Sequence, residues 1–227
     1  ALRKRLEDPV RSVRIAAAST LRANLDQASP AAREYLHYLD NNADHPSGQL
    51  QKGMYFLARN EPASALPHLQ KAIAWDPHSP PFRQELAVAY SLLDRPQDAV
   101  DTLKEACRLA PEDADCHYQL GLAYNEIRDL KNAAAELEKA VRLDSHHVRA
   151  WYNLGLAQSA LGREEEAIES LLRAEAGDPG DARIPYARAT ILARLGRKQE
   201  ALQAAKLALQ LNPSLVEAGR LVEVIRR

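Results

Sequence analysis

The chain has 227 residues, and its 30 Lys and Arg against 31 Asp and Glu give a formal net charge of −1. Hydrophobic residues make up 46 % and charged residues 27 %, which is the balance of an ordinary soluble globular protein. The near-neutral total argues against wholesale binding to nucleic acid, and no apolar run of about 18 residues is present to span a membrane. Aromatic residues are only 5 %, and the dominance of Ala and Leu favours helices over a β-sandwich.

The first predicted element is a helix within residues 6–21, where Asp8-Pro9 precedes two Val-Arg dipeptides and a run of alanines. This segment resembles a HEAT repeat, in which Asp-Pro starts a helix and Val-Arg and Ala-Ala follow at fixed offsets. One such unit cannot bury both of its faces, so we expect more HEAT-like helices before residue 1. Because the chain opens on Ala1 without Met, we expect it to be a piece of a longer protein. A lone helix is predicted over residues 30–41.

Residues 46–215 contain an internal repeat with a period of 34 residues. Two alanine columns lie seven residues apart, and a column of small residues precedes the first of them by 12 positions. The first alanine column is Ala65, Ala99, Ala133, Ala167 and Ala201, and the second is Ala72, Ala106, Ala140, Ala174 and Ala208. The small column is Gly53, Ala87, Gly121, Gly155 and Ala189. Because positions seven apart share one helix face, the period predicts two antiparallel helices per repeat that approach closely at the small residues.

The fourth repeat reads Trp151-Tyr-Asn-Leu-Gly155 followed by Ala167, Leu171, Ala174 and Pro179, and it resembles the tetratricopeptide repeat (TPR) family. The resemblance implies an all-α, right-handed superhelix of antiparallel helix pairs. It places five repeats at 46–79, 80–113, 114–147, 148–181 and 182–215. Departures from the pattern fall in the outer repeats, where Lys52 and Arg188 replace a Leu and Pro185 replaces the Trp.

Residues 216–227 are predicted to form one more helix that caps the last apolar face, and a dimerisation helix is the alternative. The junction at residues 42–46, between the HEAT-like and TPR-like segments, resembles the C-terminal part of bacterial multihaem c-type cytochromes. The haem-attachment motif C-x-x-C-H is itself absent. Cys116-His117 would need a Cys three residues before Cys116, and that residue is Asp113. The compartment is left open by the sequence. We expect a soluble protein of the cytoplasm, or of the periplasm if the cytochrome-like context holds.

No motif for catalysis is present: the chain lacks a phosphate-binding Gly-rich loop, a nucleophile elbow and a zinc-protease helix. We therefore expect no enzyme activity, no cofactor and no metal site. His146 and His147 are predicted to be solvated turn residues. Cys107 and Cys116 are expected to be two separate, half-buried thiols, with a disulfide between them as the alternative.

The predicted inner face of the helix pairs carries the candidate binding site. In TPR arrays the residue three before the small column points into the concave groove, and here Tyr118, Tyr152 and Tyr186 occupy it in successive repeats. The residues expected around these tyrosines are Arg149, Arg183, Asn153, Gln119, Asn125, Leu122 and Leu156. Tyr with Arg and Asn is typical of peptide-binding surfaces, because aromatics supply contact area and Arg and Asn bond to backbone or carboxylate groups. The alternative is a purely structural tyrosine ladder.

Charge is distributed unevenly, with +4 over residues 1–22, +6 over residues 183–227 and −11 over the remainder. The pattern is explained if one end continues into further sequence and the other is a solvated cap, and a basic docking patch for an acidic partner is the alternative. Self-association of the basic C-terminal repeat with the acidic middle of another copy is a third hypothesis.

These features predict a non-catalytic scaffold that binds a peptide or protein partner in the concave groove. The alternative function is an accessory docking domain of a larger electron-transfer or other catalytic protein.

Overall fold

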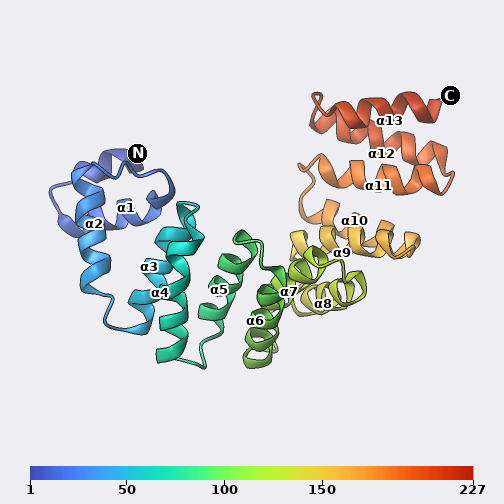
Figure 1. Ribbon diagram of the computed structural model, residues 1–227. Helices are drawn as coiled ribbons and strands as arrows, with labels where there is room; N and C mark the ends of the chain where they lie inside the picture. The colour runs from blue at the N-terminus through green and yellow to red at the C-terminus, as the bar shows by residue number, and fades with distance from the viewer. Residues whose placement is uncertain (227) are drawn as a thin grey trace. The chain divides into compact units, whose positions relative to one another are not determined.

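The computed structural model describes residues 1–226, and every regular element within that range is a helix (Figure 1). The predicted all-α class is therefore confirmed. The chain forms two compact units, Ala1–Pro111 and the part from Glu112 onward.

The first unit contains two short 3-10 helices and six α-helices. They are η1 (Leu2–Glu7), α1 (Arg11–Thr20), η2 (Arg22–Asn24), α2 (Pro30–Asn41), α3 (Pro46–Ala58), α4 (Pro62–Trp75), α5 (Pro80–Leu92) and α6 (Pro96–Leu109). The helix expected at 30–41 is confirmed at these bounds. Five of these helices begin at a proline, whose fixed φ and missing N–H suit the first helical position.

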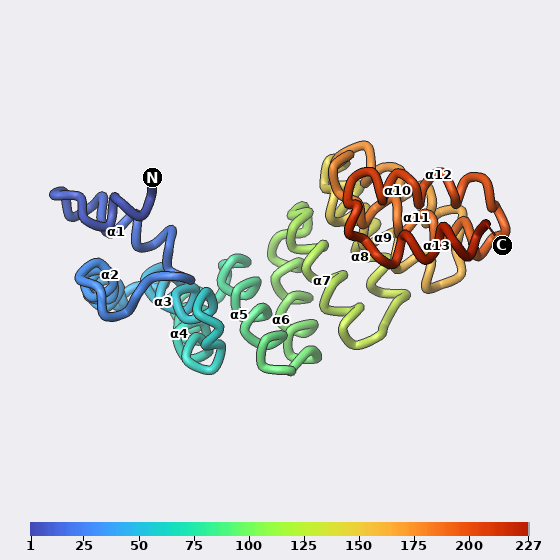
Figure 2. The backbone as a smooth tube through the Cα atoms, turned by 90° about the horizontal axis from the view of Figure 1, so that it is seen from above, coloured from blue at the N-terminus to red at the C-terminus, as the bar shows by residue number. Residues whose placement is uncertain are grey.

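The second unit contains three helix pairs and a final helix. They are α7 (Ala114–Glu126), α8 (Leu130–Leu143), α9 (Val148–Ala160), α10 (Glu164–Gly177), α11 (Arg183–Arg194), α12 (Lys198–Leu211) and α13 (Val216–Arg226). Figure 1 shows α11, α12 and α13 stacked in sequence, and Figure 2 views the same helices from above. Buried Ala218, Val222 and Ile225 fix α13 to this stack, which is the geometry of a cap. Residue 227 of the expected C-terminal helix lies outside the described residues.

Glycine sets the distance between the two helices of a pair. A Cβ atom added at Gly155 would lie 2.8 Å from Leu171 Cγ and 3.1 Å from the Ala167 carbonyl oxygen. At Gly121 the same atom would lie 2.7 Å from Leu137 Cγ. In the last pair both positions are alanine, Ala189 and Ala205, and both are fully buried, whereas the α5–α6 pair has Ala87 and Leu103. Close approach at the small column is therefore confirmed.

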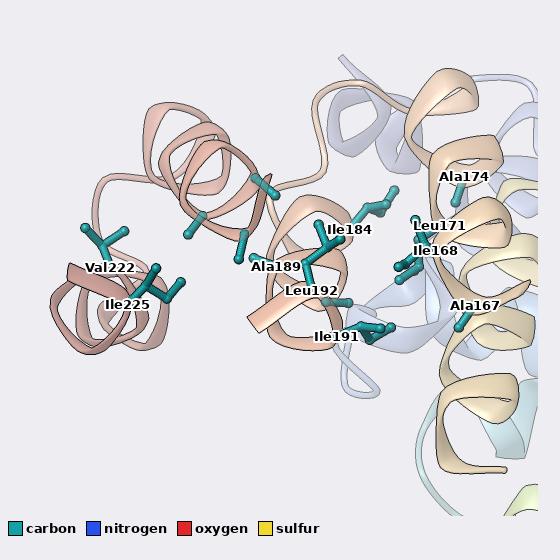
Figure 3. Packing of buried hydrophobic residues seen from close by; sticks show 14 residues of the cluster. Ala167, Ile168, Leu171, Ala174, Ile184, Ala189, Ile191, Leu192, Val222 and Ile225 are labelled. Carbon is teal, nitrogen blue, oxygen red and sulfur yellow. The ribbon is translucent and has the colours of Figure 1, made fainter. Parts of the chain in front are cut away.

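Within the second unit, successive pairs are joined by the apolar face of each second helix. In Figure 3, Ile168 and Leu171 of α10 point towards Ile184 and Ile191 of α11, and these side chains belong to one buried cluster. The cluster continues through α11 to Val222 of α13. Within this unit each pair thus covers the apolar face of the pair before it, as repeat proteins require.

The polar departures from the repeat pattern are compensated locally. Lys52 Nζ lies 2.6 Å from Asp40 Oδ1, and Arg188 Nη2 lies 3.0 Å from Glu175 Oε2. Pro185 is fully buried in the first turn of α11, where a backbone N–H has no partner within the helix.

The turn between the helices of each pair uses one residue with a positive φ. Asn60, Asp94, Arg128, Gly162 and Gly196 adopt this conformation at intervals of 34 residues. Glycine and asparagine fit it readily, whereas Arg128 holds it against the steric preference of its side chain.

We predict that Gly155→Ala destabilises the protein, because the new methyl group overlaps Leu171 and Ala167. Overpacking of this kind costs about 1–3 kcal/mol, more than the gain in helix propensity of up to ~1 kcal/mol. Gly219→Ala in α13 is the matched control, since an added Cβ there has no atom within 4 Å. Thermal unfolding followed by circular dichroism should show a lower midpoint for Gly155→Ala and an equal or higher one for Gly219→Ala. A rise in both midpoints would contradict the packing account.

Candidate binding face

Three tyrosines define a continuous column on the first helices of the second unit. Tyr118 lies on α7, Tyr152 on α9 and Tyr186 on α11, and each is half-buried. Burial raises the pKa of the Tyr118 and Tyr152 phenols, and the charges of Arg149 and Arg183 respectively oppose this rise. Each of these two tyrosines therefore has an arginine of the following repeat beside it. We call this surface the tyrosine face: the three tyrosines with Arg149, Arg183, Gln119, Leu122, Asn125, Asn153 and Leu156.

The two arginines of the face differ in what holds them. Arg183 Cζ lies 5.8 Å from the centre of the Tyr152 ring, a cation–π distance. Its guanidinium is also bound to Asp181, with Nη2 at 2.6 Å from Oδ2, and this pairing lowers the pKa of the Asp181 carboxyl. For Arg149, no carboxylate oxygen among residues 1–226 lies within ion-pair distance. Arg149 can therefore pair with an acidic group of a ligand without losing a partner of its own.

A small hollow lies beside the tyrosines. It measures about 70 Å³ and is lined by Leu122 and Asn125 of α7, Asn153, Leu156 and Ala157 of α9, and Leu137 of α8. Four residues that the sequence assigned to the binding face thus line one depression. Leu156 remains 40 % exposed at this point, and the Asn153 side chain is anchored by donating to the Arg149 carbonyl oxygen at 2.8 Å. The hollow offers exposed apolar surface next to two side-chain amides.

Gln119 and Ser159 mark the borders of the face. The Oε1 atom of Gln119 is buried and accepts no hydrogen bond from the described residues. At the far end of α9, Arg194 Nη2 donates to Ser159 Oγ at 2.5 Å and to Glu164 Oε2 at 2.8 Å. The hydroxyl of Ser159 is therefore already engaged within the protein.

The prediction that His147 is a solvated turn residue is wrong. Its side chain is only 9 % exposed and its ring centre lies 4.6 Å from that of Tyr118. Nδ1 accepts the Ala150 N–H at 3.2 Å and so caps α9, which leaves Nε2 as the donor to Asp115 Oδ1 at 3.1 Å. His146, in contrast, is solvated as predicted, with its side chain 97 % exposed.

His147 and Asp181 are site residues that the sequence prediction missed. A signal for them exists, because His45, Ser79, Asp113, His147 and Asp181 recur every 34 residues in front of the first helices. In four of these repeats the side chain accepts a backbone N–H of the following helix. A column of capping residues at the repeat period thus predicts which side chains are held at the edge of the face.

The basic C-terminal repeat is largely neutralised inside its own unit. Arg188 pairs with Glu175, Arg194 with Glu164, and Arg197 with both Glu165 and Glu200. The charge excess of residues 183–227 therefore overstates the positive surface that an acidic partner would meet.

Other classes of site have no support in the described part of the chain. Residues 1–226 contain no cluster of three or more metal-ligating side chains. No helix among them is long and apolar enough to cross a membrane. Cys107 and Cys116 are both buried and not joined in a disulfide.

Comparison with known protein families identifies the repeat. Tetratricopeptide repeat models match residues 56–122, 118–182 and 171–215. The chain belongs to the tetratricopeptide repeat family. The implied fold, a solenoid of antiparallel helix pairs, is thereby confirmed.

Solved structures show the same TPR fold. MamA is 25 % identical with a TM-score of 0.68, over 73 % of this chain and 96 % of MamA. MamA from Desulfovibrio magneticus RS-1 is 23 % identical with a TM-score of 0.70, over 76 % of this chain and 97 % of that one. YrrB, a TPR protein with an unusual peptide-binding site, is 21 % identical with a TM-score of 0.70, over 83 % of this chain and 97 % of YrrB. No curated protein sequence matches the chain.

We predict that His147→Ala destabilises the TPR array whereas His146→Ala does not. Loss of a helix cap costs about 0.5–2 kcal/mol, and an aromatic contact adds about 0.5–1.5 kcal/mol. The neighbouring His146 makes no comparable contact, so its replacement should change stability by less than about 0.5 kcal/mol. Urea unfolding of the two variants measures the difference. Equal midpoints would show that the His147 contacts do not stabilise the face.

Proposed function

We propose that this TPR protein is a non-catalytic scaffold that binds a peptide segment of a partner protein on the tyrosine face. The main support is the hollow on α7 and α9, where Leu156 is 40 % exposed and half-buried Leu122 shares the lining with the amides of Asn125 and Asn153. Apolar contact area surrounded by a few fixed polar groups is what a peptide-binding groove needs. Membership of the TPR family and the likeness to YrrB, a peptide-binding TPR protein, support the same function.

The charges of the face indicate which peptides fit. Arg183 is neutralised by Asp181, whereas Arg149 has no ion-pair partner among residues 1–226. An acidic residue of the peptide would therefore be placed at Arg149, and apolar side chains would fill the hollow. The tyrosine rings flank this path and add area at a small cost in side-chain entropy.

We also infer that the five repeats span residues 46–215 and follow a HEAT-like segment. The helix pairs α3–α4 to α11–α12 each fall within one proposed 34-residue repeat. Ahead of them, Asp8-Pro9 and the N-cap residue Val10 precede α1, and Asp8 Oδ1 accepts the Val10 N–H at 2.9 Å. This arrangement favours a second candidate function, a docking module of a larger electron-transfer or catalytic protein. Haem-binding C-x-x-C-H motifs in the adjoining sequence of the full-length protein would support it, and their absence would remove the electron-transfer version.

The binding proposal is tested with peptides selected from a random library displayed on phage. Binding of a selected, fluorescently labelled peptide is then measured by anisotropy. Leu156→Lys should weaken binding by about tenfold or more, because truncating or charging a central apolar contact costs about 1–2 kcal/mol. Leu172→Lys is the matched control, since Leu172 is 46 % exposed but lies on α10 outside the face.

Replacing Tyr118, Tyr152 and Tyr186 together by Ala should abolish peptide binding, and circular dichroism checks that the helices remain.

Arg149→Glu should weaken the binding of acidic peptides more than the binding of neutral ones. Equal effects of Leu156→Lys and Leu172→Lys, or full binding by the triple variant, would overturn the proposal.

A further inference from the structure

A cavity of the first unit lies outside the tyrosine face. It measures about 440 Å³ and opens among α1, η2, α2 and α3, which Figure 1 shows at the N-terminal, blue end of the chain. Its volume is in the range of small-molecule sites. Three of the four elements that line the cavity, α1, η2 and α2, precede residue 46. The cavity therefore lies between the N-terminal segment and α3, the first helix of the TPR array.

One wall of the cavity presents a cation that is short of acceptors. Arg22 Nη1 donates to the Ser19 carbonyl oxygen at 3.0 Å, which fixes the guanidinium in place. The Nε–H of Arg22 is buried and has no acceptor among the described residues. No carboxylate oxygen within residues 1–226 lies at ion-pair distance from Arg22. Since arginine keeps its proton, the missing partner is an acceptor, and an anionic one is favoured.

The surrounding charge supports an anion. Residues 1–22 carry a net charge of +4, and the Glu34 carboxylate is already shared by Arg14 at 2.7 Å and Arg11 at 3.5 Å. The carboxyl group of Glu85 on α5 is influenced by the Arg22 charge, yet burial dominates and raises the pKa of this group. No Glu85 oxygen lies within ion-pair distance of Arg22.

The other walls are apolar and partly aromatic. Ile15 of α1, Met54 of α3 and the ring of Tyr38 line the cavity. The Tyr38 ring is stacked with that of Tyr35 at 6.3 Å between centres and 14° between planes. The Tyr35 hydroxyl donates to Ser19 Oγ at 3.3 Å, so the Ser19 hydroxyl hydrogen remains available for a further acceptor. Flat apolar surface thus faces the same space as the guanidinium.

We propose that this cavity binds a carboxylate attached to an aromatic body, with the carboxylate on Arg22 and the ring against Tyr38, Ile15 and Met54. Two sources share this chemistry: a free aromatic carboxylic acid, and the C-terminal aromatic residue of a peptide. The site is separate from the tyrosine face, and its occupancy does not depend on the proposed function of that face.

Isothermal titration calorimetry on the full chain tests the proposal with three probes. They are N-acetylphenylalanine, its uncharged amide, and a hexapeptide ending in Phe with a free carboxylate. The free acid should bind saturably and the amide at least about tenfold more weakly, because the amide cannot form the charge-assisted bond. This comparison uses the unaltered protein and so does not depend on the folding of any variant. A hexapeptide that binds more than about tenfold tighter than the free acid indicates the peptide source, and equal affinity indicates the small acid.

Arg22→Gln should weaken binding of the acid about as much as amidation does, while Arg33→Gln should leave it unchanged. Arg33 is the matched control because it is exposed on α2 and does not line the cavity. The proposal is overturned if no probe binds saturably, if acid and amide bind equally, or if the two arginine variants behave alike.

Discussion

The contact between Gly155 and Leu171, with its equivalents in the other pairs, is the constraint on which the structure depends. A Cβ added at Gly53, Gly121 or Gly155 would lie less than 3 Å from the facing Leu, so these three pairs close only with the glycine turned inward. Each helix residue turns by about 100°, so Tyr152, three residues before Gly155, lies about 60° from the contact line. Leu156, one residue after it, lies about 100° away. This geometry explains why the tyrosines are half-buried while Leu156 is exposed on the same side.

The same period that packs the helices also arranges the surface. Capping residues recur in front of the first helices, and His147 and Asp181 in that column hold Tyr118 and Arg183 in place. The edge of the tyrosine face is therefore fixed by helix caps. Within the face, Arg183 is neutralised by Asp181, whereas Arg149 has no ion-pair partner among residues 1–226.

Most of the helical framework could be predicted from the sequence, because it depends on local signals. Alanine columns, the Gly–Leu contact and prolines at the first helical position indicate helix pairs at known offsets, and α2 occupies the expected residues 30–41. The tyrosine column follows from the same register. Ion pairs such as Arg194–Glu164 join residues 30 apart on different helices, so summing charge along the chain missed them. The N-terminal cavity was equally hidden, since its walls come from four separate segments.

NMR on the ¹⁵N-labelled chain with a selected peptide shows directly whether the peptide lies on the tyrosine face. If it does, the largest amide shift changes map to α7 and α9, around Leu122, Asn125, Arg149, Asn153 and Leu156. Changes concentrated instead on the second helices α8, α10 and α12 would contradict it.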